Sequence, residues 1–439
     1  MKTAIFMLVA RLLVTATLAA EEPGREPHAG NPILPGYYAD PSLVQFDGKF
    51  YIYATLDPWG DKTLGCWESA DFKNWTYRVL NWPTKAACNS PTSGGAAVWA
   101  PSVVRAKNGK FYMYVSVGNE VWAGVAEHPL GPWQNALGDR PLIHGKFKPG
   151  FHMIDAEAFV DDDGTGWLYW GSGWNWTNGK CWAVKLKSDM VSFDGEVHDV
   201  TPTNYFEGPI MVKRGGRYFL MNSTGITIKD NYQVHYAVGD NPLGPFVEPK
   251  NSPILVTDKA KNVISPGHHT VFRHDGKDYI LYHRHSIPFD PKFVGRQVCV
   301  DELKFTADGL IEKVVPTHEG PALVRGRKTG LPATASASSG EARFAVDDNY
   351  ATRWTAKGGW LQLDLGAVKT FARQEIRFEY AWKRYQFTVE ISDDAQQWKK
   401  LAEQTATGSP VAIEQQDSAR YLRLTTSENI SIWEWVVLP

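Results

Sequence analysis

The chain has 439 residues, of which 43% are hydrophobic and 21% are charged, and its formal net charge is -2 at pH 7. A chain of this length exceeds the usual size of one domain, so we expect two. Its nearly balanced charge gives no reason to expect nucleic acid or a membrane as a partner. The 18 Trp residues are consistent both with packing between β-sheets and with stacking on sugar rings.

The first twenty residues have the pattern of a secretory signal peptide. Lys2 provides a positive start, residues 5–20 are largely apolar, and the small pair Ala19 and Ala20 precedes Glu21. No later segment approaches the ~18 consecutive apolar residues of a membrane span. We therefore expect an exported protein, secreted or periplasmic, whose mature part begins at residue 21.

Five similar segments predict a β-propeller over residues 21–316. Each segment places Asp-Gly, Asn-Gly or Gly-Gly before an aromatic, β-rich run, which is a hairpin signal. Consecutive turns are 51 to 61 residues apart, counted between their glycines Gly48, Gly109, Gly164, Gly215 and Gly276. A repeat of this length that contains several short strands is typical of one propeller blade, so five copies predict five blades.

An ionisable residue lies before four of the five turns. Asp40, Asp155, Glu207 and His268 each precede their turn glycine by eight or nine residues. The innermost strand of each blade lines the central channel of a propeller, and its first residues open onto one end of that channel. The spacing therefore predicts a funnel that holds three carboxylates and one imidazole.

The four cysteines do not have the spacing of a zinc motif. Cys66 and Cys88 lie between the first two turns, and they would be able to pair in an oxidising compartment. The alternative is that all four are buried, unpaired thiols.

The composition changes after Pro316 and indicates a second domain. Residues 317–330 are richer in Gly, Pro and basic residues, which is typical of a linker. From residue 331 onward the sequence shows strand-like alternation, for example at Leu361, Leu363 and Leu365, and no long amphipathic helix. We expect residues 331–439 to form a small β-sandwich of the jelly-roll type, so the whole chain is predicted to be all-β.

Three carboxylates in one funnel are suited to the hydrolysis of a glycosidic bond. This reaction needs one carboxyl group that donates a proton to the leaving oxygen and a second that activates water. The acid keeps its proton near neutral pH only if burial or a nearby negative charge raises its pKa. Asp40, Asp155 and Glu207 supply such a set, although spacing alone does not assign the roles.

The propeller region resembles glycoside hydrolase family 43. Residues 31–42 (NPILPGYYADPS) are similar to the opening of that family, and its later motifs are matched in order by Trp99-Ala-Pro-Ser, Ile154-Asp155, Glu207-Gly-Pro and Gly267-His268. Members of the family are five-bladed propellers that invert the anomeric centre. The resemblance implies that Asp40 is the general base, that Glu207 is the general acid, and that Asp155 raises the pKa of the acid and orients it.

Two positions have alternatives. The family commonly has Ile-Asp-Pro where this chain has Ile154-Asp-Ala-Glu157, so Glu157 would be able to substitute for Asp155 on the same side of a strand. We favour Asp155 because it keeps the repeat register. The resemblance places His268 near a structural calcium or sodium ion in the channel, while the alternative is a neutral, hydrogen-bonded histidine. Hydrolysis itself is expected to require no cofactor.

Arg296, Trp99 and Trp174 are the candidate substrate-binding residues. Arg296 lies in a segment that resembles the Gly-Arg motif of the family's last blade, where a guanidinium would bind sugar hydroxyls or hold a carboxylate. Solvent exposure is the alternative for Arg296. Trp99 is expected to form a wall of the sugar pocket, and Trp174, together with Trp176, either extends its rim or packs in the core.

The C-terminal region resembles the coagulation-factor type C (discoidin-like) fold and is close to carbohydrate-binding module family 32. The matching residues are 347–354 (DDNYATRW), 360–366 (WLQLDLG) and 392–398 (SDDAQQW). Ligand contacts in such modules come from loops, and Trp382, Lys383 and Arg384 form a candidate binding tip. The module either binds polysaccharide or braces the propeller.

Together these features predict a secreted, inverting exo-glycosidase that releases terminal α-L-arabinofuranosyl residues from plant-type polysaccharides. Alternatives within the family are a β-xylosidase, an endo-arabinanase, or an enzyme that cleaves galactan or galactofuranose. A different class is a non-catalytic carbohydrate-binding propeller. The presence of all three carboxylates disfavours it, because binding alone needs no pair of groups poised for proton transfer.

Overall fold

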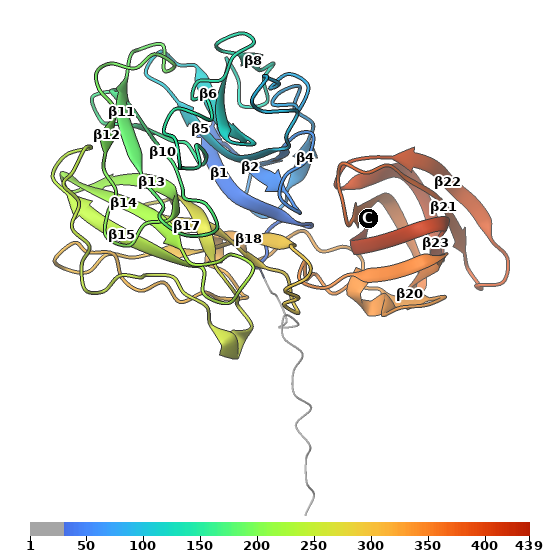
Figure 1. The fold of residues 1–439 in the computed structure, drawn as a ribbon. Helices are drawn as coiled ribbons and strands as arrows, with labels where there is room; N and C mark the ends of the chain where they lie inside the picture. The colour runs from blue at the N-terminus through green and yellow to red at the C-terminus, as the bar shows by residue number, and fades with distance from the viewer. Residues whose placement is uncertain (1–29) are drawn as a thin grey trace, which may run out of the picture.

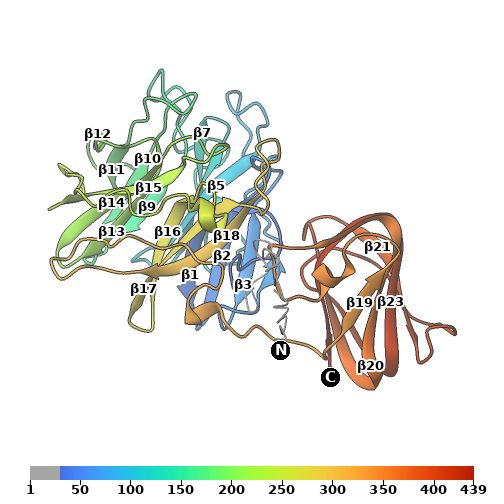
Figure 2. The ribbon, with the colours of Figure 1, turned by 90° about the horizontal axis from the view of Figure 1, so that it is seen from below.

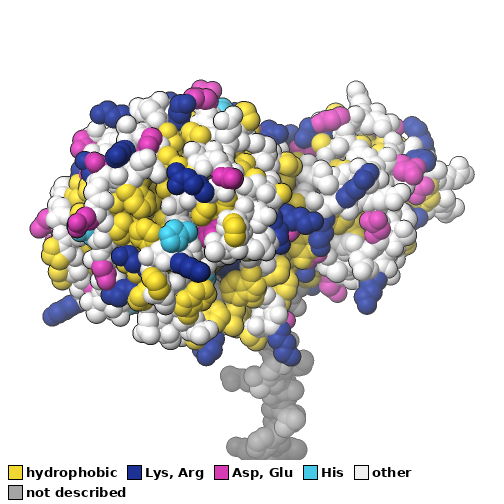
Figure 3. All heavy atoms as spheres, turned by 45° about the horizontal axis from the view of Figure 1, so that its top comes forward, with side chains coloured by type: hydrophobic (Ala, Val, Ile, Leu, Met, Phe, Trp, Pro, Cys, Tyr) yellow, Lys and Arg dark blue, Asp and Glu magenta, His cyan; other side chains and the backbone are white. Residues whose placement is uncertain are grey.

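The computed structural model describes residues 30–439, and the signal peptide predicted at residues 1–20 lies outside them (Figure 1). The described chain forms a large N-terminal domain and a smaller C-terminal domain beside it. Apart from three short 3-10 turns, the regular structure of residues 30–439 is entirely β, as predicted. Within the same residues, no helix has the length and apolarity needed to cross a membrane. Basic and acidic side chains are interspersed over the face in Figure 3.

The N-terminal domain consists of five antiparallel sheets, which confirms the five blades predicted from the repeats. The first three sheets have four strands each. The first contains β1 (Tyr38–Phe46), β2 (Lys49–Leu56), β3 (Gly65–Ser69) and β4 (Thr76–Arg78), and the second contains β5 (Val98–Arg105), β6 (Phe111–Val117), β7 (Glu120–Ala126) and β8 (Gln134–Asn135). The third contains β9 (Glu157–Val160), β10 (Gly166–Trp170), β11 (Trp182–Leu186) and β12 (His198–Asp199). The last two have three strands each: β13 (Glu207–Arg214), β14 (Arg217–Thr224) and β15 (Gln233–Gly239), then β16 (Gly267–His274), β17 (Lys277–His285) and β18 (Arg296–Leu303).

The predicted turns join the first and second strands of the blades. In the first and last blades the turn residues Asp47, Gly48, Asp275 and Gly276 all have positive φ. This conformation is that of a two-residue type I′ turn, whose twist matches that of the flanking strands. The turns therefore sit at one end of the propeller and leave the beginnings of the inner strands at the other end.

Aromatic and aliphatic side chains fill the space between neighbouring blades. Tyr53 of β2 and Met113 of β6, for example, belong to one buried cluster. Cys66 and Cys88 lie in this same cluster as free thiols, and all four cysteines of the chain are buried and unpaired. Of the two alternatives for the cysteines, the structure therefore shows the reduced one.

Residues 30–34, before the first blade, and residues 317–330, the connector after the last blade, join the two ends of the propeller. The Asn31 side chain donates a hydrogen bond to the Val300 carbonyl (2.8 Å) and accepts one from the Val300 amide (2.9 Å). The amide of Asn31 also donates to the carbonyl of His318. Val324, in the segment predicted as a linker, is buried against the first and last blades. The connector thus packs on the propeller over its first half.

The C-terminal domain is a β-sandwich with the strand order β19-β20-β23-β21-β22 (Figure 2). Its strands are β19 (Thr334–Ala337), β20 (Trp354–Phe378), β21 (Tyr385–Ser392), β22 (Lys399–Ala406) and β23 (Val411–Leu438). The long strands β20 and β23 take part in both layers, because Arg373 pairs with both Glu414 and Leu438. Leu361, Leu363 and Leu365 point into the core, as their alternation predicted.

The loop that carries Trp382 faces the propeller. The Trp382 ring packs edge-on against Tyr38, with 5.9 Å between ring centroids, and the neighbouring Ala381 is buried in a propeller cluster. The Lys383 ammonium lies 3.7 Å from the ring centre of Tyr380. Of the residues predicted to form a binding tip, Trp382 is half-buried and packs on the propeller, whereas Lys383 and Arg384 are exposed, so this role stays a prediction.

Candidate active site

Each blade begins with a residue in the left-handed region, and this feature directs the site residues into the channel. The five residues at this position are Asp40, Ala100, Asp155, Gly208 and His268, with φ between 37° and 60°. The pairing register of the inner strand breaks at this position in four of the blades, as expected for a β-bulge. A left-handed conformation is unfavourable for residues other than glycine, and such strain is concentrated at functional sites.

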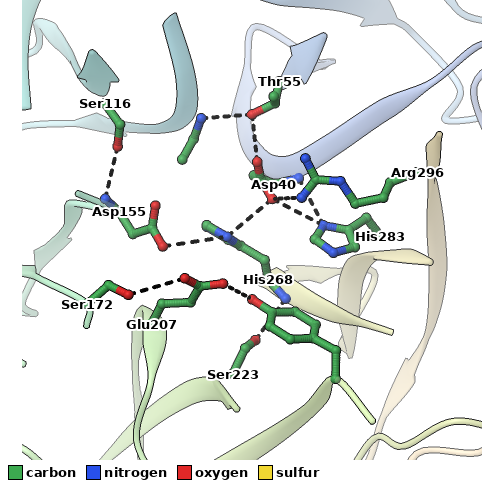
Figure 4. A network of polar contacts seen from close by, with 12 residues as sticks. Asp40, Thr55, Ser116, Asp155, Ser172, Glu207, Ser223, His268, His283 and Arg296 are labelled. Carbon is green, nitrogen blue, oxygen red and sulfur yellow. Dashed lines mark hydrogen bonds and ion pairs between the residues drawn. The ribbon is translucent and has the colours of Figure 1, made fainter. Parts of the chain in front are cut away.

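Glu207 lies one residue before this repeated position, so its spacing to the turn is misleading. The turn of the fourth blade is formed by Gly215 and Gly216, which both have positive φ. Gly208, eight residues before Gly216, is therefore the counterpart of Asp40. Glu207 corresponds instead to Trp99 of the second blade, and both side chains line the same pocket. Figure 4 shows Glu207, Asp40 and Asp155 converging around His268.

Asp40 is held in its ionised form. Arg296 Nη1 donates to Oδ1 (3.0 Å) and the Thr55 hydroxyl donates to Oδ2 (2.7 Å). Burial alone would raise the pKa of Asp40, but the positive charge of Arg296, followed by the interactions with His268 and His283, brings it well below its usual range. Asp40 is thus a carboxylate across the neutral pH range and is able to accept a proton.

Arg296 is fixed by a second carboxylate. Its Nε and Nη2 atoms donate to Asp57 Oδ2 (2.9 Å) and Oδ1 (2.7 Å), which is the two-pronged geometry that suits a guanidinium. The Arg296 amide donates to the same Asp57 Oδ2 at 2.7 Å. The remaining guanidinium nitrogen, Nη1, donates to Asp40. Of the alternatives considered for Arg296, the structure shows a buried guanidinium that holds a carboxylate, and the solvent-exposed alternative is wrong.

Glu207 is the carboxyl group whose pKa is suited to proton donation. Burial raises its pKa to about 7, the negative charge of Asp40 adds to this effect, and hydrogen bonds from Tyr232 and Ser172 oppose it. The Tyr232 hydroxyl donates to Oε1 (2.8 Å) and the Ser172 hydroxyl donates to Oε2 (3.2 Å). Near neutral pH, Glu207 therefore carries a proton for part of the time while Asp40 does not.

Asp155 lies behind the pocket. Burial raises the pKa of Asp155 well above its usual range, and the charges of Glu207 and Asp40 raise it further. Its Oδ2 lies 3.9 Å from His268 Nδ1. Asp155 lines a small inner cavity of the channel, whereas Asp40 and Glu207 line the outer pocket. Asp155 thus lies in the inner cavity, and its pKa depends on the charges of the two carboxyl groups that line the pocket.

Glu157, the alternative to Asp155, also lines the inner cavity and not the pocket. Burial raises its pKa to about 8, and a hydrogen bond with Ser102 opposes the shift. The charges of Glu207 and Asp40 raise the pKa of Asp155, whereas the pKa of Glu157 is shifted only by burial and by its hydrogen bond with Ser102. The geometry therefore favours Asp155.

The pocket above the carboxylates has a volume of about 260 Å³ and a rim rich in tryptophan. Trp99 and Trp174 both line it, together with Trp176, and their contact with a sugar stays a prediction. Trp174 is 46% exposed and stacks on the His152 ring, with 4.2 Å between ring centroids. Trp59, which sequence reasoning missed, is 45% exposed and covers Arg296 at 5.2 Å. Exposed indole faces at a pocket mouth are suited to stacking on sugars.

Thr227 is a second pocket residue that sequence reasoning missed. It is only 3% exposed, and its hydroxyl has no hydrogen-bond partner within residues 30–439. A buried hydroxyl without a partner is costly, so the cost is relieved when a bound sugar hydroxyl supplies the missing hydrogen bond. Thr227 lies in the loop after β14, where no repeat or motif marks it.

His268 contacts carboxylates instead of forming part of a metal cage. Its Nδ1 lies 3.2 Å from Asp40 Oδ1, and burial lowers its pKa. No group of three or more His, Cys, Asp or Glu side chains within residues 30–439 is arranged to hold a metal ion. The described residues therefore do not fit an ion held by protein ligands, and His268 as a ligand of a structural calcium or sodium ion stays a prediction.

An ionised carboxylate and a carboxylic acid that share one aromatic-lined pocket at the channel mouth of a five-bladed propeller define a glycoside hydrolase. Comparison with known families agrees with this class. Residues 29–311 match the family model of glycosyl hydrolases family 43, and the chain belongs to this family. Residues 344–424 match the NedA-like, galactose-binding domain.

Relatives of the chain differ in the sugar that their names specify. The chain is 38% identical over 310 residues to the β-D-galactofuranosidase xynD of Aspergillus niger, a match that covers 66% of this chain and 86% of that protein. It is 27% identical to an arabinoxylan arabinofuranohydrolase of Bacillus subtilis over 70% of this chain and 67% of that protein. A solved structure described as a glycoside hydrolase has a TM-score of 0.80 and 30% identity, and the match covers 94% of this chain and 99% of that one.

Proposed function

We propose that the protein is a secreted, inverting exo-glycosidase that releases terminal furanosyl residues, with α-L-arabinofuranosyl as the first candidate. The observation that carries this proposal is a pair of carboxyl groups in one pocket whose pKa values are shifted in opposite directions, that of Asp40 downward and that of Glu207 upward to about 7. The pocket, with about 260 Å³, is slightly smaller than the usual ligand site of about 300–1,000 Å³, which suits the end of a chain better than its middle.

In the proposed reaction Glu207 and Asp40 act on opposite faces of the terminal sugar. The bond between the anomeric carbon and the leaving oxygen breaks while Glu207 transfers its proton to that oxygen. A water molecule attacks the anomeric carbon from the other face, and its proton passes to Asp40, so the configuration inverts. These steps use only protein groups and water. The role of each carboxylate follows the family resemblance, and the pKa shifts support it.

Arg296 and Asp155 act on the protonation of the two reacting groups in opposite directions. Arg296 stabilises the negative charge of Asp40, which favours its use as a base. Asp155 makes loss of the proton from the buried pair with Glu207 less favourable, because two like charges would then lie close together. The pair therefore retains one proton near neutral pH, and Glu207 is the member that lines the pocket and is able to pass this proton to a substrate.

A second candidate is the release of β-D-galactofuranosyl residues. The observation that favours it is the 38% identity to a β-D-galactofuranosidase. α-L-Arabinofuranose and β-D-galactofuranose have the same arrangement of ring substituents, and the latter carries one additional hydroxymethyl group. A pocket that orients the ring through Thr227 and the carboxylates is therefore suited to both sugars, and the space around the exocyclic carbon decides between them.

The test compares p-nitrophenyl α-L-arabinofuranoside, β-D-galactofuranoside and β-D-xylopyranoside with the full chain. We expect turnover of at least one furanoside and loss of that turnover in Glu207→Gln. Glu157→Gln is the matched control, because Glu157 lies outside the pocket and its raised pKa makes glutamine a close substitute. Turnover of the xyloside alone would contradict the furanoside specificity. Equal turnover by Glu207→Gln would contradict the proposed site, and sugar binding without turnover would favour a carbohydrate-binding propeller.

A further inference from the structure

An aromatic side chain of the propeller is enclosed by the C-terminal domain. Tyr37, which directly precedes β1, forms one buried cluster with Tyr350 and Trp433 of the C-terminal domain. The Tyr37 and Trp433 rings meet edge to face, with 5.4 Å between centroids, and each residue is 1% exposed. Phe293 of the propeller also packs on Tyr37, with 5.1 Å between ring centroids. This arrangement buries large rings from both domains and holds Tyr37 in place.

Arg353 of the C-terminal domain adds a cation to this cluster. Its guanidinium lies 5.4 Å from the ring centre of Tyr37 and 5.2 Å from that of Trp433. An ion pair with Glu379 (3.1 Å) holds the guanidinium in position. A cation over two aromatic faces in a partly desolvated place strengthens the contact and defines its geometry.

Two further contacts join the domains at neighbouring positions. Gln297 Nε2 donates a hydrogen bond of 2.8 Å to the carbonyl of Tyr350. Gln297 is fully buried and directly follows Arg296. At the residue after Tyr37, the ring of Tyr38 packs against Trp382. The C-terminal domain therefore contacts the residues just before Asp40 and the residue just after Arg296.

The residues contacted by the C-terminal domain are connected to the ion pairs of the active site by hydrogen bonds and by the chain itself. The carbonyl of Tyr37 accepts a hydrogen bond from the amide of Asp57 (3.2 Å). The carboxylate of Asp57 holds the guanidinium of Arg296, and Arg296 in turn holds Asp40. Both strands that meet in this network, β1 and β18, thus have one end packed against the C-terminal domain.

We propose that the C-terminal domain is a positioning element of the active site, which keeps Arg296 in register with Asp40 through the cluster of Tyr37, Trp433 and Arg353. The domain then contributes to hydrolysis even of substrates too small to reach its own surface. This inference rests on the proposed function only for the role of Asp40. The packing of the two domains around Tyr37 does not depend on that role.

The inference predicts a specific change in pH dependence. If the cluster loosens, Arg296 is less well placed against Asp40, and the pKa of Asp40 rises. Asp40 must be ionised to accept a proton, so the acidic limb of the pH profile moves to higher pH. A domain that only binds polysaccharide would change the apparent affinity for polymer and would leave this limb where it is.

The test uses the full chain with Trp433→Ala and Arg353→Met. For a p-nitrophenyl furanoside we expect kcat to fall about tenfold in Trp433→Ala and about threefold in Arg353→Met, with KM within about twofold and the acidic limb moved to higher pH. Trp398→Ala is the matched control, because Trp398 packs on Arg423 within the C-terminal domain. Both kcat and the acidic limb are expected to stay unchanged in this control.

Hydrogen exchange provides a readout that does not need activity. We expect faster amide exchange in peptides covering residues 36–42 and 295–298 in Trp433→Ala and in Arg353→Met, but not in Trp398→Ala. A failure of the proposed function would appear as an inactive wild type, and exchange would still test the contact. Unchanged exchange and an unchanged acidic limb in folded Arg353→Met and Trp433→Ala would overturn the inference. If Trp433→Ala does not fold, the results for Arg353→Met alone support or overturn the inference.

Discussion

Replacement of Asp155 by asparagine tests the electrostatic coupling in the buried site. Asp155→Asn keeps the size of the side chain and removes one ionisable group next to Glu207. The pKa of Glu207 is raised from 4.5 to about 7 in the folded protein, and Glu207 must be protonated to act as the acid. The basic limb of the pH profile therefore reports the loss of this proton.

The size of the expected shift is estimated from Coulomb's law for two like charges at a typical separation of neighbouring buried groups. Two like charges about 6 Å apart, in surroundings with an effective dielectric constant of about 20, repel each other by about 3 kcal/mol, which corresponds to about 2 pH units. Solvent in the pocket weakens this repulsion. We therefore expect the basic limb of Asp155→Asn to move to lower pH by about 1 to 2 pH units. In this variant the proton of Glu207 leaves without a second carboxylate at residue 155 to repel the charge that forms.

The matched experiment moves the same limb in the opposite direction. The Tyr232 hydroxyl donates to Glu207 Oε1 at 2.8 Å and lowers its pKa. Tyr232→Phe removes this donor, so the pKa of Glu207 rises and the basic limb moves to higher pH by about 1 pH unit, since a hydrogen bond to a charged group contributes about 1.5–3 kcal/mol.

The measurement for both variants is kcat/KM of a p-nitrophenyl furanoside across the pH range, with the wild type measured in parallel. Shifts of opposite sign are the expected result. A basic limb that stays in place in Asp155→Asn, or that moves in the same direction in both variants, would refute the assignment of this limb to Glu207 and of the coupling to Asp155.

Three further predictions concern the pocket. Asp40→Asn and Glu207→Gln should each reduce kcat/KM by about 10²–10⁴ while the circular dichroism spectrum stays unchanged; near-wild-type rates would contradict the assigned roles. Arg296→Lys should move the acidic limb to higher pH, because lysine cannot reproduce the two-pronged contact with Asp57, and a limb that does not move would argue against this contact. Thr227→Val should lower kcat/KM about tenfold, as expected for one lost hydrogen bond to a sugar hydroxyl; unchanged kinetics would show that the hydroxyl does not contact substrate.

The repeated turns made the propeller predictable from sequence. Asp-Gly and Asn-Gly pairs require a specific backbone conformation, so they mark the hairpins whatever surrounds them. The same spacing located Asp40, Asp155 and His268 at equivalent positions. It was misleading for Glu207, because the double glycine at Gly215 hides which residue ends the turn. The family resemblance identified Glu207 independently of the spacing.

The contacts that adjust the site were not predictable. Asp57 and Arg296 are 239 residues apart in the chain, and no local pattern signals their pairing. Thr227 lies in an irregular loop that only the fold brings to the pocket. Trp382 has the character of an exposed binding residue in the sequence, and it is half-buried because the two domains pack together. Such long-range contacts depend on tertiary structure and leave no periodic signal.

The most direct test of the proposed mechanism is the configuration of the first sugar released. Hydrolysis of p-nitrophenyl α-L-arabinofuranoside or β-D-galactofuranoside, followed by proton NMR before the product equilibrates, identifies this anomer. Attack of water assisted by Asp40, opposite a leaving group protonated by Glu207, predicts that an α-linked substrate first yields the β-sugar, and a β-linked substrate the α-sugar. Release of the sugar with its original configuration would contradict the mechanism.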